Sequence, residues 1–245
     1  MRQLSEWTDV EDPAWPVLQD EFAGRPVPVE VLPVTPSRAA PGCSSCGSAR
    51  DPLSLVLHSG GLVVDHGRVR VLAGAPSGAA GLPGPARVNR FPAAFDPAWR
   101  PLGALVVGHD VLGGVFALNG HDPAACGRPG APGQMLCFAP DSLEREAREM
   151  GCGTWLTWLL PGRLDQFHDG LRWPGRQRES QSPELSQGIA GYPFLRSKEA
   201  RADSAATTRT PVPLTELPTL SSDFCRQTGL GDPGFLGSFP SEGPA

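Results

Sequence analysis

Residues 60–72 read GGLVVDHGRVRVL, and this stretch predicts a β-hairpin. Its centre, residues 65–67 (Asp-His-Gly), has the composition of a tight turn, because glycine readily adopts the positive φ that such turns need. On the returning strand, residues 68–72, arginine alternates with valine. This alternation predicts that the valines face a core and that Arg68 and Arg70 face water.

Further segments predict that the hairpin belongs to a larger sheet. They share short runs of apolar residues bounded by turn-forming residues, and they are residues 27–32, 104–107, 115–118 and 135–138. Pro28 predicts an edge position for its strand, because proline cannot donate a hydrogen bond to a neighbouring strand. We therefore expect a central, mostly antiparallel sheet within residues 27–138. Residues 143–150 fit either a helix or an irregular strand, and the Gly/Pro-rich residues 74–97 predict a surface loop.

Three helices are predicted from apolar residues spaced three, four or seven positions apart. They are residues 13–24, 154–160 and 163–171, and the first two place tryptophans on their apolar sides. Helices that each present one apolar stripe are expected to pack on the same face of the sheet. The sequence thus predicts an α+β fold with helices on one face.

The length of 245 residues suits one domain, and no charged or Ser/Gly-rich linker divides the chain near its middle. We assign residues 1–227 to this domain. Eight of the 17 residues from 229 to 245 are Gly or Pro. Such a composition gives little apolar surface to bury, so residues 228–245 are predicted to form a disordered tail.

The charge and hydropathy of the chain narrow its partners and its location. With 21 basic and 26 acidic residues the net charge is −5, which disfavours nucleic acid as a partner. No run of about 18 apolar residues is present, so no membrane partner is expected. The first residues lack the apolar core of a signal peptide, which predicts a cytoplasmic protein with free thiols.

Cys43 and Cys46 have the spacing of half a zinc site. A structural zinc ion takes four ligands, and the other four cysteines are isolated in the sequence. We therefore expect no cofactor, with zinc at Cys43 and Cys46 as the alternative.

Known catalytic motifs are absent from the sequence. The one lysine, Lys198, follows no glycine-rich loop, which excludes a phosphate-binding loop, and no GxSxG motif occurs. Asp65-His66 and His109-Asp110 each follow a Leu-Val-Val strand. Were those strands neighbours, the four side chains could gather at one rim for metal binding or acid–base chemistry. The alternative is that they form turns and contact water.

Candidate binding residues lie elsewhere in the chain. Trp173 follows Arg172, and an exposed pair of this kind has the composition of an interface anchor, although core packing is the interpretation that we favour for Trp173. Asn119 is a third candidate, and with Gly120 it also forms a favourable turn.

Several motifs, in this order, resemble an uncharacterised bacterial domain-of-unknown-function family, the 2625 family, over about residues 4–217. They are residues 11–16 (EDPAWP), 60–67 (GGLVVDHG), 110–119 (DVLGGVFALN), 138–141 (FAPD), 171–175 (LRWPG) and 192–194 (YPF). More remotely, the order of elements is similar to the SUKH superfamily, whose α+β domains include immunity proteins against bacterial toxins.

That resemblance implies a non-enzymatic protein-binding module, with a toxin or another protein as its partner. The alternative is a metal-assisted or acid–base hydrolase that uses Asp65, His66, His109 and Asp110.

Overall fold

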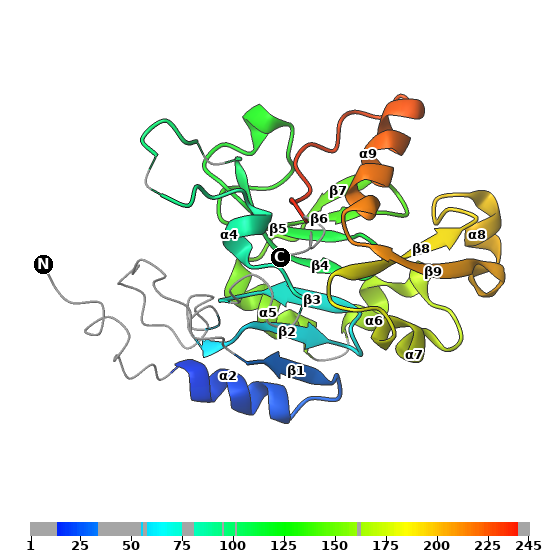
Figure 1. Ribbon diagram of the computed structural model, residues 1–245, viewed down its shortest axis with the longest axis horizontal. Helices are drawn as coiled ribbons and strands as arrows, with labels where there is room; N and C mark the ends of the chain where they lie inside the picture. The colour runs from blue at the N-terminus through cyan, green and yellow to red at the C-terminus, as the bar shows by residue number, and fades with distance from the viewer. Residues whose placement is uncertain are drawn as a thin grey trace, which may run out of the picture.

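A seven-stranded antiparallel sheet forms the centre of the protein (Figure 1). The computed structural model describes residues 14–33, 55, 58–74, 81–94, 96–100, 102–160 and 163–239. The strands are β1 (Val29–Leu32), β2 (Gly61–Val64), β3 (Val69–Leu72), β4 (Ala104–Asp110), β5 (Val115–Asn119), β6 (Met135–Ala139) and β7 (Glu144–Ala147). Each strand pairs with the next one along the chain, which confirms the predicted α+β class and antiparallel sheet.

The edges of the sheet both follow from local sequence. Pro28 precedes β1, and β1 is an edge strand as predicted. The ambiguous residues 143–150 contain the opposite edge strand β7, so the sheet extends beyond residue 138. The two Leu-Val-Val segments belong to β2 and β4, and β3 lies between them. They share a sheet but are not neighbours.

The β2–β3 hairpin forms as predicted, with Val64 opposite Val69. Asp65, His66 and Gly67 all have positive φ angles. A side chain at Gly67 would place its Cβ 2.7 Å from the carbonyl oxygen of Ser180. Glycine is therefore required here both by the conformation and by the close approach of a later segment.

The first face of the sheet is covered by the three predicted helices, α2 (Ala14–Ala23), α5 (Cys152–Leu159) and α6 (Arg163–Phe167). Trp155 of α5 is fully buried, and its ring lies 5.1 Å from that of Phe116 on β5. Gly108 makes room for it, because a Cβ at this position would lie 3.3 Å from the indole.

The second face is also covered, which corrects the expectation that helices pack on one face alone. Its cover comprises α4 (Pro85–Val88), α9 (Glu216–Gln227) and a two-stranded sheet of β8 (Gln187–Tyr192) and β9 (Thr208–Pro213). In Figure 1, α9 and the β8–β9 pair lie together beside the main sheet. Helix α9 was not predicted, although its buried Leu217, Ser221 and Cys225 repeat every four residues.

The predicted exposure of Arg68 and Arg70 is wrong. The guanidinium of Arg68 lies 5.5 Å from the Trp173 ring, and that of Arg70 donates to the carbonyls of residues 185 and 187. Arg68 is 2% exposed and Arg70 is fully buried. The remaining short helical segments are η1 (Ala124–Cys126), η2 (Asp169–Leu171), α7 (Arg176–Gln181), α8 (Lys198–Ala202) and η3 (Ser204–Ala206). Of the helices that the structure describes, none is long and apolar enough to cross a membrane.

The segment 228–239 differs from the disordered tail predicted by its Gly/Pro content. Leu236 and Phe239 are each 5% exposed and belong to the core of the second face. The amide of Ser238 donates to the carbonyl of Val88 at 2.8 Å, and the Phe239 ring packs edge-on against His109. Burial of these apolar side chains stabilises a segment that has little regular structure. Residues 240–245 lie outside the described residues.

We predict that Phe239→Ala lowers the free energy of unfolding by about 3 kcal/mol, as expected for a buried phenylalanine. The matched control is Phe91→Ala, because Phe91 is 44% exposed, and its loss should be below about 1 kcal/mol. Urea denaturation of both variants measures the difference. Equal, small losses would show that residue 239 does not pack on the sheet.

Candidate functional site

The four predicted cluster residues lie near one end of the sheet but do not form one site. Asp65 and His66 occupy the β2–β3 turn, where α7 packs against them. The Asp65 carboxylate pairs with Arg176 at 2.9 Å, and the Gln181 side-chain amide donates to His66 Nδ1 at 3.2 Å. Both side chains are thereby engaged by α7.

His109 and Asp110 are consecutive residues of β4, so their side chains point to opposite faces of the sheet. The His109 ring lies against Phe239 on the second face, 5.2 Å away. The Asp110 carboxylate lies on the first face, 3.3 Å from Nε2 of His168. Strand alternation therefore separates the two members of this pair.

The buried carboxylate of Asp110 has three hydrogen-bond partners. One of its oxygens, Oδ1, accepts the amides of Leu112 and Gly114, each at 2.8 Å, and Oδ2 faces His168. Burial opposes ionisation of this carboxyl, but the hydrogen bond from His168 and the charge of Arg68 lower its pKa overall. Asp110 is thus a fixed carboxylate. Its space depends on Gly114, because a Cβ there would lie 2.4 Å from Oδ2.

His168 follows α6 and is also buried. Burial lowers its pKa, and the charge of Arg68 adds to this effect against the opposing influence of Asp110. The imidazole is therefore neutral at neutral pH. Nε2 faces the Asp110 carboxylate, and a hydrogen bond to the backbone carbonyl of Leu164 also acts to raise the pKa of His168. A carboxylate that orients a neutral histidine in this way is the arrangement found in general-base catalysis.

A cleft of about 930 Å³ lies over this pair, between strands β5–β7 and helices α5–α6. Arg148 lies within it, with its guanidinium 5.2 Å from the Trp158 ring and 4.8 Å from the Phe167 ring. Glu146 pairs with Arg148 at 3.4 Å. The cleft also has charged side chains of both signs in Asp141 and Arg163, which makes its lining mixed in charge.

The predicted binding residues have structural contacts instead of forming an exposed anchor. Trp173 is buried, its Nε1 donates to Glu179 at 2.8 Å, and the guanidinium of Arg209 lies 4.3 Å from its ring. The core alternative for Trp173 is the one observed. Arg172 is half-buried, and its carbonyl accepts the Ser204 hydroxyl.

Asn119 is buried at the end of β5. Its side-chain amide donates to the carbonyl of Pro129 at 2.9 Å, which joins the strand to the following loop. This contact gives Asn119 a role in the turn.

The zinc alternative falls on Cys43 and Cys46, which lie outside the described residues. The four described cysteines are free thiols. Burial, followed by the charge of Glu146, raises the pKa of Cys137 to about 12, which makes it unreactive. Within the described ranges, no group of three or more His, Cys, Asp or Glu side chains is placed to hold a metal ion.

Comparison with known proteins now places the chain. A family model described as "Protein of unknown function DUF2625" matches residues 4–217. The chain belongs to the DUF2625 family. It is 33% identical to the uncharacterized protein YbfG of Escherichia coli (strain K12) over 223 residues, which cover 89% of this chain and 94% of that protein. An uncharacterized protein of Haemophilus influenzae is 27% identical over 198 residues, or 80% and 83% of the two chains. No solved structure matches significantly.

Three residues that line the cleft over Asp110 were not predicted from the sequence. They are His168, Glu146 and Arg148. His168 is 58 positions from Asp110, and no motif links the two. Glu146 and Arg148 could have been found from strand alternation, because both project from the same side of the β7 segment. That signal was lost because residues 143–150 also fit a helix.

We predict that His109 makes the protein less stable in mild acid. Burial, assisted by the charge of Arg70, lowers the pKa of His109 from 6.5 to about 3. Between pH 6.5 and pH 4.5 the unfolded chain therefore takes up a proton that the folded chain does not. The free energy of unfolding should fall with decreasing pH by up to about 1.4 kcal/mol per pH unit from this residue.

Denaturation of the variant His109→Leu over this pH range tests the prediction, because its slope should be shallower by that amount. His121→Gln is the control, since His121 is exposed and its loss should leave the slope unchanged. Parallel slopes for wild type and His109→Leu would contradict the assignment.

Proposed function

We propose that the protein is a non-enzymatic binding module whose partner is another protein, and that the cleft over Asp110 and His168 is the recognition site. The observation that carries this proposal is Arg148, which lies on two aromatic rings inside an open cleft. Tryptophan and arginine are the residues most enriched among those that dominate binding energy at protein interfaces.

The charges of the cleft support a protein ligand over other classes. The side chain of Glu146 is 49% exposed and that of Arg148 is 23% exposed, so both can exchange their mutual contact for a partner's groups. Small-molecule sites are mostly apolar, whereas charged side chains of both signs line this cleft. A nucleic acid would meet acidic residues here and a net charge of −5 overall.

An immunity role is one specific form of this proposal. The element order similar to SUKH domains motivates it, with a toxin as the partner. In that form, the cleft would bind a toxin segment that carries both acidic and basic side chains.

We expect a protein encoded beside this gene to form a complex that depends on Arg148. Co-expression followed by size-exclusion chromatography identifies the complex, and calorimetry measures its Kd. Arg148→Ala should raise the Kd about 30-fold, as for a residue worth about 2 kcal/mol at an interface.

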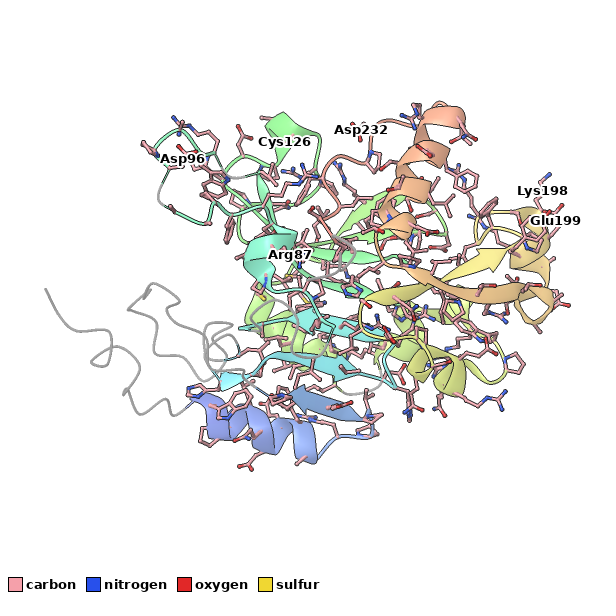
Figure 2. The ribbon with its side chains drawn as sticks, viewed as in Figure 1. Arg87, Asp96, Cys126, Lys198, Glu199 and Asp232 are labelled. Carbon is pink, nitrogen blue, oxygen red and sulfur yellow. The ribbon has the colours of Figure 1, made fainter. Side chains whose placement is uncertain are left out.

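The matched control for this experiment is Arg87→Ala. Arg87 is an exposed arginine of α4 (Figure 2) and does not line the cleft, so its loss should change the Kd less than about twofold. Failure of every neighbouring protein to bind, or equal losses in both variants, would count against the proposal.

A second candidate function is an acid–base hydrolase in the same cleft, and the Asp110–His168 pair is the observation that favours it. Of the four residues that the sequence suggested for catalysis, only Asp110 belongs to this pair, and its partner His168 was not among them. His168 would act as the general base toward water while Asp110 holds the ring in position.

If this candidate is right, wild type hydrolyses 4-nitrophenyl acetate or bis(4-nitrophenyl) phosphate, and His168→Gln lowers kcat/KM by about 100-fold or more. Because the pKa of His168 lies below 6.5, the rate should persist into mild acid. His121→Gln, at an exposed histidine, should retain full activity. Undetectable wild-type hydrolysis, or equal activity in His168→Gln, would end the hydrolase hypothesis.

A further inference from the structure

A second cleft, of about 610 Å³, lies between strands β1–β3 and the segment 180–186. Leu32 and Val63 line it; Leu32 belongs to the core of the second face, and Val63 packs against that core. It is therefore separate from the cleft over Asp110 and His168, which shares no lining residue with it. Arg70 of β3 and Ser180 of α7 also line this second cleft.

The guanidinium of Arg70 is held by one end only. Its Nη1 donates to the backbone carbonyls of Leu185 and Gln187. Its Nε and Nη2 are buried and have no hydrogen-bond partner. These two nitrogens form the edge of the guanidinium that presents two parallel N–H bonds, the geometry that matches the two oxygens of a carboxylate.

Arg70 is also a buried cation without an ion pair. Burial lowers its pKa to about 10, so it stays protonated at neutral pH. No Asp or Glu within the described ranges lies at salt-bridge distance from it. A buried charge normally has a hydrogen-bonded counter-charge, because burying it alone is costly.

Ser180 adds a second unpartnered polar atom to the same cleft. Ser180 is 1% exposed, and its hydroxyl has no hydrogen-bond partner. A hydroxyl can donate to an oxyanion that the arginine binds. Two buried side chains of one cleft, from β3 and α7, thus both have unused donors.

We propose that this cleft binds the carboxylate group of a small ligand, with the Nε–Nη2 edge of Arg70 as its main contact and the Ser180 hydroxyl as a further donor. The ligand supplies the counter-charge that Arg70 lacks. Binding satisfies three donors that the protein otherwise buries unpaired.

Acidic residues at the cleft define the rest of the ligand. Glu30 and Glu184 line it and are exposed, whereas Arg70 is fully buried. Negative charge near the opening and positive charge in the interior favour a ligand that carries a cation at the end opposite its carboxylate. An ω-amino acid has this pattern, and a dicarboxylate has the opposite one.

Calorimetry on the full chain at constant ionic strength tests the proposal with three four-carbon probes. 4-Aminobutyrate, butyrate and succinate share a carboxylate and differ at the far end. We expect 4-aminobutyrate to bind with a Kd of about 1 mM or below, butyrate more weakly, and succinate most weakly. Inorganic phosphate serves as a fourth probe and should bind more weakly than 4-aminobutyrate.

Three variants locate the binding. Arg70→Gln should weaken 4-aminobutyrate binding at least about tenfold, as expected for a lost charged hydrogen bond. Ser180→Ala removes an unpartnered hydroxyl, so it should fold normally and weaken binding about threefold or more. Arg178→Gln is the matched control, because Arg178 is an exposed arginine of the same helix α7 and does not line the cleft. Its loss should leave the Kd unchanged.

Absence of heat with all four probes would overturn the proposal. So would phosphate binding more tightly than every carboxylate, or equal losses in Ser180→Ala and Arg178→Gln. If Arg70→Gln does not fold, the Ser180→Ala result decides the question by itself.

Discussion

The buried carboxylate of Asp110 connects the main sheet to the helical layer on its first face. It fixes the turn between β4 and β5 through two backbone amides, and it fixes the end of α6 through His168. A carboxylate with fewer partners could not remain ionised at this depth. The centre of the sheet and the helical layer on its first face therefore depend on the same side chain, and the larger cleft lies directly over it.

Local sequence patterns predicted the parts of the fold that depend on neighbours in the chain. The hairpin around Asp65, the edge strand after Pro28 and the tryptophan-bearing helix α5 all follow from residue spacing. The burial of Arg68 and Arg70 could not be predicted from residue spacing. Their guanidinium groups donate to carbonyls of Leu171 and of residues 185 and 187, more than 100 positions away. Alternation on one strand carries no information about what covers it.

In the candidate sites, too, local sequence predicted single residues but not the distant residues that they contact. Asp110 and His66 were identified from sequence as polar residues at strand ends, and each lines a cleft. Their partners were not identified, because His168 comes from a helix end and Gln181 from a helix that no pattern predicted. Trp173 was suspected as an anchor on composition alone, and its ion-pairing neighbours Glu179 and Arg209 come from two further elements.

The pairing of every strand with its sequence neighbour has a consequence for biosynthesis. All seven strands of the main sheet, and the helices of its first face, precede residue 168. The sheet can therefore assemble hairpin by hairpin while the ribosome is still translating. Apart from α4, the cover of the second face comes from residues 187–239, so we expect Leu72 and Val115 to stay exposed on a nascent chain until that segment is translated.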